Sequence, residues 1–214
     1  MDFELSEEQR LLKDSVERLT TQRYDFETRK KFMAEPDGWS RDMWRQYAEL
    51  GLTALPFAEE HGGIGGGPVE TMIVMEAFGR ALALEPYLAT VVIGGGFLRG
   101  GASDAVKAEL LPKVAAGEAL LSFAHLERQA RYDLADVATT AKKDGAGYVL
   151  NGEKSLATHG DCADRLIVSA RPRAISAPRM ASGCSLSMPN RTASPAAAIR
   201  RWTACAPPKS PCRT

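Results

Sequence analysis

A run of glycines at residues 62–67 is the segment whose composition comes nearest to a phosphate-binding loop. It offers backbone N–H groups with few side chains in the way. A P-loop also needs a Lys followed by Ser or Thr after the glycines, and a strand before them. Because these features are absent, residues 62–67 predict a loop with unusual dihedrals and no nucleotide cradle. Gly94–Gly96 likewise predicts close helix packing or a helix break.

Carboxylates between residues 127 and 136 could serve acid–base chemistry. Glu127, Asp133 and Asp136 lie close together in the sequence, and a facing pair of carboxyl groups can divide the roles of acid and base. Nothing in their spacing shows that they face each other. The simpler interpretation is a set of solvated loop charges, so no catalytic group is predicted here.

The histidines and cysteines are the residues that would hold a metal ion or form disulfides. The three histidines have no Cys or Asp at ligand spacing, so they are expected to be structural. The cysteines show no CxxC pairing, which predicts neither a zinc site nor a redox pair, and Cys162 is expected to be a buried apolar residue. The residues concerned are His61, His125, His159, Cys162, Cys184, Cys205 and Cys212.

The overall composition is that of a soluble globular protein. The chain has 214 residues, of which 44% are hydrophobic and 25% are charged. Apolar runs such as 71–77 and 87–93 are far too short to cross a membrane, and the opening Met1-Asp2-Phe3-Glu4 is acidic where a signal peptide is basic. The sequence therefore predicts a cytoplasmic protein with no membrane segment.

The charge and composition change abruptly after Arg171. Residues 1–171 hold 20 basic and 27 acidic residues, whereas residues 172–214 hold seven basic residues and no acidic ones. The second segment also contains seven of the twelve prolines and three of the four cysteines. It shows neither a helical nor a strand period, so it is predicted to be irregular.

Three interpretations of residues 172–214 are open. A basic arm could bind nucleic acid, but seven positive charges over 43 residues make a thin arm. A disordered linker is the second. The third, which we favour, is a GC-rich coding sequence translated out of frame, because that yields Ala, Pro, Arg, Ser and Cys. We therefore expect no nucleic-acid partner.

Residues 1–117 carry helix signals with clear starts and stops. Ser6 with Gln9 has the spacing of a capping box, and the helical pattern continues to about residue 35. Ser40 predicts a second start, Pro68 a third, and Ser103 the last. The predicted helices are 7–35, 41–50, 68–82, 84–99 and 103–116, with the apolar segment 68–82 buried nearly all round. One helical domain, 1–117, is predicted.

After Gly117 the pattern changes to short runs broken by Gly, Asp and Asn. These runs predict strands at 120–126, 138–142, 147–150, 153–158 and 165–170. Asp144-Gly145 and Asn151-Gly152 are hairpin dipeptides, so 138–160 is predicted to be an antiparallel meander. The fold class predicted is α+β: an all-α domain at 1–117, the start of an antiparallel β domain at 118–171, and an irregular tail at 172–214.

Six short segments in a particular order resemble the acyl-CoA dehydrogenase family. No single segment is specific, but the order is, and the likeness covers residues 1–171. Within the family, the chain resembles the small subunit of bacterial pimeloyl-CoA dehydrogenase. The segments are Leu5-Ser-Glu-Glu-Gln9, Leu50-Gly-Leu52, Pro56 with Glu60-His-Gly-Gly-Ile-Gly65, Glu76-Ala-Phe-Gly-Arg-Ala-Leu82, Leu111-Pro-Lys-Val-Ala-Ala-Gly-Glu118 and Leu150-Asn-Gly-Glu-Lys154.

The resemblance implies a three-domain flavoenzyme: a helical domain, a β domain and a C-terminal four-helix domain, with FAD between the last two and across a subunit boundary. The implied reaction is α,β-dehydrogenation of an acyl-CoA thioester, with electrons passing to an electron-transfer flavoprotein. The implied base is a glutamate of the C-terminal domain. This chain is expected to end before that domain, so no catalytic residue is assigned.

The resemblance also implies flavin-binding residues in the first of two stretches. The family pattern is an aromatic residue, two small or apolar residues, then Thr-Glu-Pro-Gly-x-Gly-Ser-Asp. This chain has Phe123-Ala-His-Leu-Glu-Arg-Gln-Ala-Arg-Tyr-Asp133. Leu126, Arg131 and Tyr132 replace the expected Thr, Gly and Ser. Phe123, His125, Leu126, Arg131 and Tyr132 are the cofactor-binding residues that the resemblance indicates.

The second stretch in the family reads Asn-Gly-x-Lys-x-Trp-Ile-Thr-Asn-Gly, with the Trp ring against the flavin. Here Leu156 stands at the Trp position, followed by Ala157 and Thr158. Thr158 keeps a hydroxyl for the flavin edge, whereas Leu156 loses a stacking contribution on the order of 1 kcal/mol. The resemblance assigns all three residues to the cofactor.

Three classes of function follow from these departures. The chain is an inactive fragment of an acyl-CoA dehydrogenase subunit, or a non-catalytic partner of a heteromeric dehydrogenase, or the product of a broken gene whose exposed faces aggregate. The partners expected are an acyl-CoA substrate, an electron-transfer flavoprotein, and a homo- or hetero-oligomeric second subunit.

Overall fold

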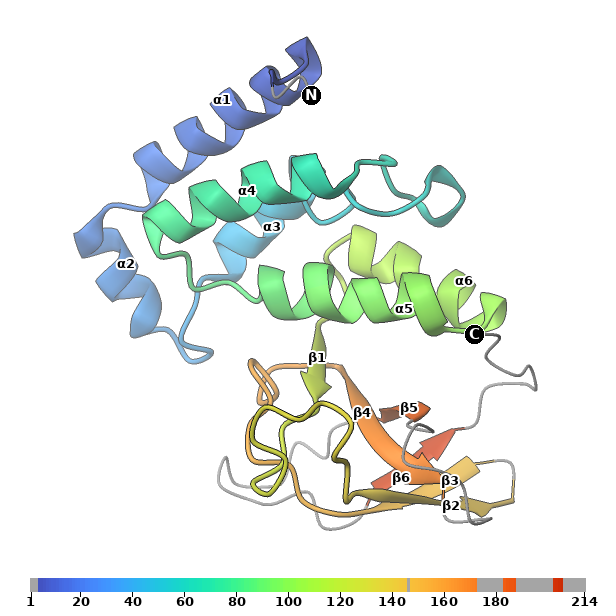
Figure 1. The fold of residues 1–214 in the computed structure, drawn as a ribbon. Coiled ribbons are helices and arrows are strands. Elements are labelled where there is room, and N and C mark those ends of the chain that lie inside the picture. Colours follow the sequence, from blue (N-terminus) through green and yellow to red (C-terminus); the bar gives the residue numbers. More distant parts are fainter. Residues whose placement is uncertain (1–3, 146, 173–182, 188–201, 206–214) are drawn as a thin grey trace.

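The computed structural model describes residues 4–145, 147–172, 183–187 and 202–205, with side-chain surroundings up to residue 172. Figure 1 shows a layer of helices with the strands gathered beneath it. The helices are α1 (Glu7–Arg23), α2 (Phe26–Met33), α3 (Arg41–Glu49), η1 (Glu59–His61), α4 (Pro68–Ala81), η2 (Leu88–Gly94), α5 (Gly95–Gly101) and α6 (Asp104–Ala115). The strands are β1 (Leu121–Ala124), β2 (Thr140–Asp144), β3 (Gly147–Asn151), β4 (Arg165–Pro172), β5 (Gly183–Ser187) and β6 (Trp202–Cys205).

The predicted helix starts at Ser6 and Ser40 are confirmed by side-chain caps, whereas Ser103 precedes α6 without a capping hydrogen bond from its side chain. The Ser6 hydroxyl accepts from the Gln9 N–H at 3.2 Å, and the Gln9 side chain accepts from the Ser6 N–H at 3.0 Å, which completes the capping box. Ser40 caps α3, and Pro68 is the first residue of α4. The predicted helix 7–35 is divided because Asp25 caps a second helix, accepting from the Thr28 N–H at 2.9 Å.

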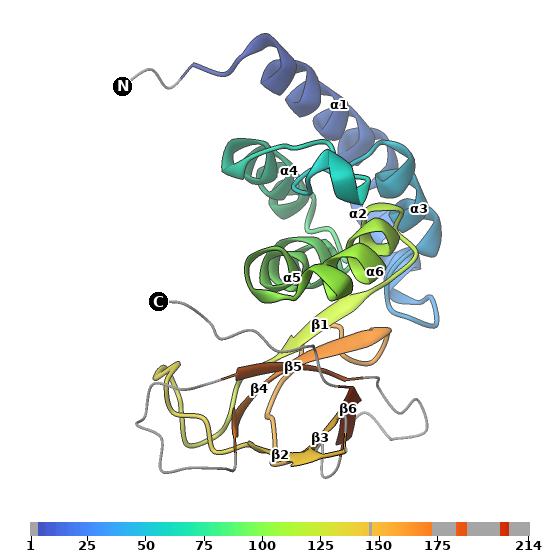
Figure 2. The ribbon, with the colours of Figure 1, turned by 90° about the vertical axis from the view of Figure 1, so that its right-hand side faces the viewer.

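The prediction that residues 68–82 are buried nearly all round was wrong. Ile73, Val74 and Phe78 are buried in α4, but Met72 is 54% exposed and Leu82 is 64% exposed. The reason is that α4 packs its buried face against α1 and the central core, whereas Met72 lines an open hollow beside Gly67 and Arg99. Figure 2 shows α4 between α1 and α5.

The segment after α4 contains a π-helix, η2, which runs directly into α5. The predicted helix 84–99 therefore starts later and has a different local geometry. A Cβ on Gly94 would lie 2.6 Å from the Leu121 Cβ, and one on Gly95 would lie 2.5 Å from the Phe57 ring. The glycines let β1 and the Phe57 loop approach this helix closely, so the prediction of close packing is confirmed for Gly94 and Gly95.

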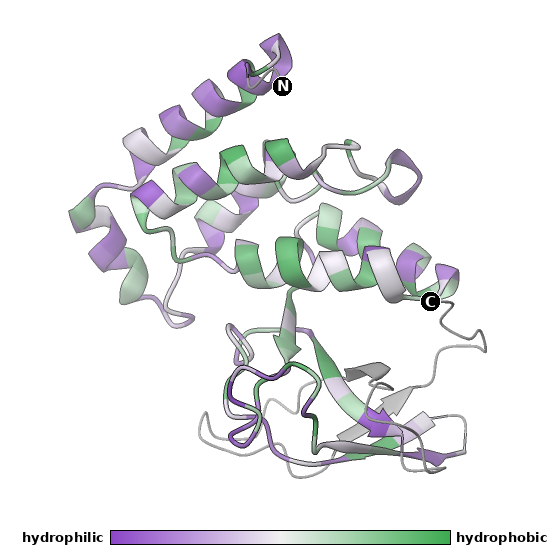
Figure 3. Ribbon diagram, in the orientation of Figure 1, coloured by the Kyte–Doolittle hydropathy of each residue, from purple (hydrophilic) through white to green (hydrophobic). Residues whose placement is uncertain are grey.

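The main core lies among the helices. Its largest fully buried side chains are Trp39, Tyr47, Tyr87, Phe57 and Met43. Rings touch throughout this core; the Tyr47 and Phe78 rings, for example, stack with centroids 4.5 Å apart. Figure 3 shows hydrophobic positions on the inner sides of the helices and hydrophilic ones on α1 and α2. No helix in the described part of the chain is both long and apolar enough to cross a membrane.

The strands form one mixed sheet in the order β1-β4-β2-β3-β6, with β5 on β4. β1 and β2 both pair with β4 in parallel, whereas β2–β3, β4–β5 and β3–β6 are antiparallel. A helical domain followed by a sheet is confirmed, but the sheet is not purely antiparallel. Long loops at 125–139 and 152–164 carry the chain back across the sheet, and such crossovers permit parallel pairing.

The predicted meander 138–160 is half right. β2 and β3 form the hairpin predicted at Asp144-Gly145, where Gly145 has a φ of 56°. Asn151-Gly152 does not turn a hairpin, because the chain leaves the sheet after Asn151. Residues 153–158 form no strand, and their one β-type backbone pairing among the described residues is the isolated bridge between Leu156 and Leu126.

Two short strands lie beyond Arg171, in the stretch predicted to be irregular. β5 pairs with β4, and β6 pairs with β3, each through backbone groups. Backbone pairing at a sheet edge does not need an alternating side-chain pattern, which is why the sequence shows no strand period there. The remainder of residues 172–214 lies outside the described residues.

A single threonine joins the helical region to the sheet. The Thr90 hydroxyl in η2 donates to the Leu121 carbonyl at 3.1 Å and accepts from the Leu121 N–H at 3.1 Å. Leu121 is the first residue of β1, and both of its backbone groups point away from β4. Thr90, which is fully buried, thus occupies the place that a neighbouring strand would take.

Candidate functional site

The two stretches predicted to face a flavin meet at one backbone contact. Leu126, after β1, and Leu156, after β3, form an isolated antiparallel bridge. The Ser155 N–H donates to the Leu126 carbonyl at 2.8 Å. The leucine side chains are 42% and 58% exposed. The bridge therefore presents two apolar side chains outward, although the segments are 30 residues apart in the sequence.

Phe123 and His125 form an aromatic row that leads to this bridge. Their rings stack at 5.3 Å with an interplanar angle of 15°, and the Phe97 ring of α5 lies 4.3 Å from Phe123. The strand places both side chains on one face because alternate residues of β1 point the same way. The row therefore runs from the helical region across β1 to the bridge.

Ala157 and Thr158 continue the second stretch. Ala157 is half-buried against the small sheet core, and its carbonyl accepts from the Gly160 N–H at 3.0 Å. The Thr158 carbonyl accepts from the Ser122 hydroxyl at 2.7 Å, while the Thr158 residue is exposed. The Thr158 backbone is thus anchored to β1, and its side chain remains accessible to a ligand.

Arg131 and Tyr132 occupy an exposed part of the 125–139 loop. Tyr132 is 99% exposed. Arg131 has a φ of 46°, in the left-handed region that glycine adopts most easily. Arg131 therefore keeps the backbone conformation suited to a glycine while carrying a large cationic side chain. The structure brings together Phe123, His125, Leu126 and Leu156, and no described hydrogen bond or ring contact ties Arg131 or Tyr132 to them.

Glu127 is buried, and the interpretation of it as a solvated loop charge was wrong. It is 4% exposed, and one of its carboxylate oxygens accepts from the Lys154 ammonium at 2.6 Å. The same carboxylate accepts from the backbone N–H groups of Ala138 at 2.6 Å and Thr139 at 3.0 Å. Asp133 and Asp136 are exposed, as predicted. Loop residue 127 turns inward because Lys154 and these amides compensate its charge.

Lys154 holds the two loops of the site together from beneath. Besides Glu127, it donates to the His125 carbonyl at 3.2 Å and to the Ser169 hydroxyl at 2.9 Å. Its side chain is 2% exposed, as is that of Glu127. Ser169 belongs to β4, so the ammonium connects that strand to the two segments that form the Leu126–Leu156 bridge.

These contacts set the charge states around the site. Burial alone would raise the pKa of Glu127, but the hydrogen bonds from Lys154, Thr139 and Gln129 outweigh it and lower that pKa to about 2. Burial, and then the positive charge of Lys154, lower the pKa of His125. Glu127 is therefore a carboxylate and His125 a neutral imidazole at neutral pH.

The other histidines and Cys162 have structural positions. His159 reaches the helical region, where its Nε2 lies 3.0 Å from the Leu84 carbonyl, and it has a φ of 56°. Cys162 is buried, and burial raises the pKa of its thiol to about 11. The described residues contain no group of three or more His, Cys, Asp or Glu side chains that could hold a metal ion.

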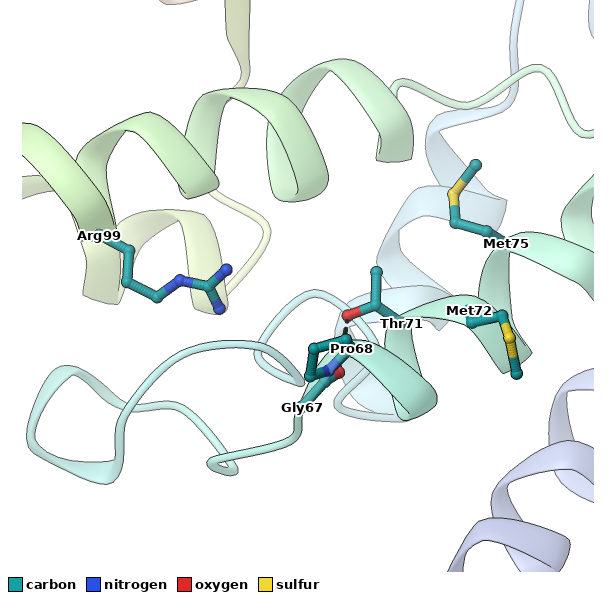
Figure 4. A pocket seen from close by; sticks show the side chains of 6 residues that line it. All are labelled: Gly67, Pro68, Thr71, Met72, Met75 and Arg99. Carbon is teal, nitrogen blue, oxygen red and sulfur yellow. Dashed lines mark hydrogen bonds between the residues drawn. The ribbon is translucent and has the colours of Figure 1, made fainter. Parts of the chain in front are cut away.

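The glycine run at 62–67 uses its backbone internally. The N–H groups of Gly65 and Gly66 donate to the carbonyls of Phe57 and Leu55, both at 2.7 Å. At the start of α4 the Gly67 N–H donates to the Glu70 carboxylate at 2.7 Å. The neighbouring pocket, of about 490 Å³, is shown in Figure 4, where Arg99 reaches toward Gly67 and Pro68. Its loop amides are already paired, so the loop is no phosphate cradle.

A second hollow, of about 560 Å³, lies along the outer face of η2 and α5. It is lined by Val92, Ile93, Gly96, Phe97, Gly100 and Gly101. Phe97 is 39% exposed and contacts Phe123, so this apolar groove is continuous with the aromatic row.

The sequence did not reveal Lys154 and Ser169 as site residues. Lys154 lies in the Asn151-Gly-Glu-Lys154 segment that carried part of the family resemblance, and Glu127 is retained from the family pattern. The presence of both Glu127 and Lys154 in segments that match the family was the signal from which their pairing could have been predicted. Their separation of 27 positions hid the pairing, because only the return of the chain along β4 brings the two loops together.

Family models match most of this chain. Residues 6–118 match the model described as "Acyl-CoA dehydrogenase, N-terminal domain", and residues 122–203 match "Acyl-CoA dehydrogenase, middle domain". Among curated relatives, the probable acyl-CoA dehydrogenase YngJ of Bacillus subtilis is 30% identical over 172 residues. That match covers 79% of this chain and 45% of YngJ. The chain thus spans less than half the length of this relative.

Solved structures show the same fold. The ChsE4-ChsE5 complex from Mycobacterium tuberculosis matches with a TM-score of 0.76 at 24% identity, covering 88% of this chain and 49% of the other. The FAD complex of PigA matches with a TM-score of 0.78 at 20% identity, covering 97% of this chain and 57% of the other. Both likenesses concern the arrangement of helices and strands.

Proposed function

The chain belongs to the acyl-CoA dehydrogenase family, and on that premise we propose that it forms part of an FAD-dependent enzyme that dehydrogenates an acyl-CoA thioester. The observation that carries the proposal is the Leu126–Leu156 bridge. It joins the two stretches that the resemblance assigns to the flavin, and it leaves both leucines exposed. The apolar groove beside Phe97 supports an acyl chain as the neighbouring ligand.

The residues at the bridge fit a flavin. Leu126 and Leu156 offer apolar side chains that would exclude water from one face of a planar ring, and Thr158 keeps an accessible hydroxyl. When bound, the flavin would supply the acceptor for the hydride that leaves the β-carbon. Arg131 and Tyr132 stay predicted cofactor contacts, and the base remains the glutamate that the resemblance implies for a C-terminal domain.

A matched pair of tryptophan substitutions tests this assignment. In the complex formed by co-expression with a full-length subunit, Leu156→Trp restores the aromatic ring that the family has at this position, and stacking on the order of 1 kcal/mol should tighten FAD binding about fivefold. Leu134→Trp is the control, because Leu134 is an exposed leucine at 70% and lies off the bridge. Equal FAD affinity for both variants, measured by quenching of flavin fluorescence, would contradict a flavin at Leu156.

We further propose that the chain is inactive alone and acts as a partner in a heteromeric dehydrogenase. The departures at Arg131, Tyr132 and Leu156 support a subunit whose flavin contacts are incomplete, and the fold of the ChsE4-ChsE5 complex supports pairing of unlike subunits. Purified alone, the chain should show little flavin absorbance. Co-expression with a full-length subunit should yield a complex, and repeated failure to co-purify would exclude the partner role.

The substrate, electron acceptor and location belong to the same proposal. Pimeloyl-CoA is the proposed thioester, an electron-transfer flavoprotein is the proposed acceptor, and the cytoplasm is the proposed compartment. A panel of acyl-CoA thioesters tested on the co-expressed complex would show the strongest bleaching of the flavin with dicarboxylyl thioesters. Equal bleaching by short monocarboxylic thioesters would exclude pimeloyl-CoA as the proposed substrate.

We also propose that residues 172–214 are read out of frame. The support is the change from net −7 to net +7 and the accumulation of Pro and Cys at that boundary. Translation of the DNA beyond codon 171 in the other two frames should restore acidic, strand-like sequence and a terminal helical domain. If neither frame does so, residues 172–203 are middle-domain sequence, in line with the family match that extends to residue 203.

A further inference from the structure

His125 is a half-buried polar side chain of the candidate site with a fixed position. Its ring stacks on Phe123, and its Nδ1 lies 3.0 Å from the Ser169 hydroxyl oxygen. Its carbonyl accepts from Lys154 at 3.2 Å. The ring is therefore held by a stacked neighbour on one face and by a hydrogen bond at one nitrogen.

The direction of the hydrogen bond between Ser169 and His125 follows from Lys154. A lysine ammonium has only donors, so the Ser169 oxygen must accept the contact of 2.9 Å from Lys154. The hydroxyl hydrogen then needs an acceptor, because Ser169 is only 4% exposed and an unpaired buried hydroxyl hydrogen is costly. The Nδ1 of His125 is the partner within reach.

The same geometry excludes the alternative proton arrangements. If Nδ1 carried a hydrogen it would donate to Ser169, and the hydroxyl hydrogen of that buried serine would have no partner. An imidazolium would have the same conflict and would also stand beside the Lys154 charge, which the Glu127 carboxylate already balances at 2.6 Å. A neutral ring with its hydrogen on Nε2 satisfies Lys154, the Ser169 hydroxyl and Nδ1, and it leaves one N–H to be paired.

We infer that Lys154 and Ser169 fix His125 as the Nε2–H tautomer, and that His125 donates this N–H to an acceptor on the ligand at the Leu126–Leu156 bridge. The second part rests on the proposed function. Nε2 forms no hydrogen bond with a described residue, and His125 is half-buried, immediately before Leu126. With Nδ1 held at Ser169 of β4, Nε2 is the ring nitrogen left available to a ligand. Carbonyl oxygens of a flavin ring are acceptors of the matching kind.

The tautomer is testable without any ligand. The described residues include all three histidines of the chain, so ¹⁵N-histidine labelling gives a simple spectrum, assigned with His61→Gln and His159→Gln variants. Long-range ¹H–¹⁵N correlation at neutral pH should show His125 with an unprotonated Nδ1 and a protonated Nε2. A protonated Nδ1, an imidazolium, or a mixture of both neutral tautomers would overturn the inference.

Ser169→Ala separates this positioning role from general stability. Removing the hydroxyl should convert His125 to a mixture of tautomers, whereas Ser169→Thr keeps the hydroxyl and should preserve the Nε2–H form. Ser155→Ala is the matched control, since the Ser155 hydroxyl donates to the Leu126 carbonyl and not to His125. An unchanged tautomer in Ser169→Ala would show that Ser169 does not fix it.

The donor role is tested in the co-expressed, flavin-binding complex. His125→Phe keeps a ring that can stack on Phe123 but lacks the N–H, and loss of one neutral hydrogen bond should weaken FAD binding roughly 2- to 10-fold. Unchanged FAD affinity would refute the donor role. A complex that binds no flavin in the unmutated form would instead refute the proposed function, and the tautomer result would stand independently.

Discussion

The helical region and the sheet region of this molecule are stabilised in different ways. The helical core is built from large side chains such as Trp39, Tyr47 and Phe57. The sheet core is small and contains three alanines among its six residues: Ala124, Leu150, Ala163, Leu166, Val168 and Ala170. The sheet side adds the buried Lys154–Glu127 pair. The candidate site is therefore made from the same polar contacts that hold its sheet and loops together.

Two buried carboxyl groups show this difference directly. Glu85, among the helices, accepts from the Tyr24 and Tyr47 hydroxyls at 2.9 and 3.1 Å, and burial raises its pKa. Glu127 has Lys154 beside it, and its pKa is lowered to about 2. Burial dominates where the neighbours are neutral hydroxyls, and charge compensation dominates where a cation is present. Of these two carboxyl groups, Glu127 forms an ion pair, and that pair with Lys154 positions the loops of the candidate site.

The largest expected effect is on the sheet side. Lys154→Met leaves Glu127 as a buried carboxylate without its cation, which typically costs about 3–5 kcal/mol. Hydrogen exchange should show lost protection at 125–139 and in β4, with the helices less affected. Lys142→Met, on an exposed position of β2, is the control and should change the free energy of unfolding by less than about 0.5 kcal/mol. If both substitutions lower the free energy of unfolding equally, the Lys154–Glu127 pair does not stabilise the sheet region as proposed.

A cavity in the helical core is expected to cost slightly less. Leu111→Ala removes a side chain that is 1% exposed in α6, and such changes cost about 2–5 kcal/mol, with about 3 kcal/mol as the central value. Urea denaturation measures it, and Leu11→Ala, at 61% exposure in α1, is the control. Here the loss of exchange protection should begin in the helices. If Leu111→Ala lowered exchange protection in the sheet alone, the two regions would not be stabilised separately as described.

The junction between the two regions should respond next. Thr90→Val keeps the shape of the side chain but leaves the Leu121 N–H and carbonyl unpaired, at a cost of about 2 kcal/mol. Thr90→Ser retains the hydroxyl and should lose less than half of that. If the two variants are equally stable in urea, the hydroxyl does not bind β1.

The smallest effects come from two glycines on either side of the junction between η2 and α5. Gly94→Ala should cost about 1–3 kcal/mol, because the new Cβ would lie 2.6 Å from the Leu121 Cβ. Gly96→Ala meets no atom within 4 Å and should stabilise the helix by about 0.5–1 kcal/mol. Thermal unfolding should therefore shift in opposite directions. Shifts of the same sign would show that β1 can move away from η2.

Much of the helical region could be predicted from local signals. Capping residues, Pro68 and the period of apolar side chains act over a few residues, so Ser6, Ser40 and Pro68 mark true helix starts. Where the prediction failed, the cause was non-local. Met72 and Leu82 look like core residues in the sequence, but their exposure depends on which face of α4 meets α1.

The candidate site was only partly predictable for the same reason. Phe123, His125, Leu126 and Leu156 were indicated by resemblance, and the bridge brings their segments together. Glu127 was taken for a solvated charge because nothing local distinguishes a paired carboxylate from an exposed one. Its partner lies 27 residues along the chain, beyond the β2–β3 hairpin.

The sequence by itself determined the helical region followed by a sheet region, and the family, because these depend on local patterns and motif order. The residues that would approach a flavin stay a prediction. Only the tertiary structure decided that Lys154 lies beneath both loops and that Ser169 faces His125. Those contacts arise when β4 crosses between β1 and β2. Parallel pairing through long crossovers joins residues whose spacing in the sequence gives no sign that they meet.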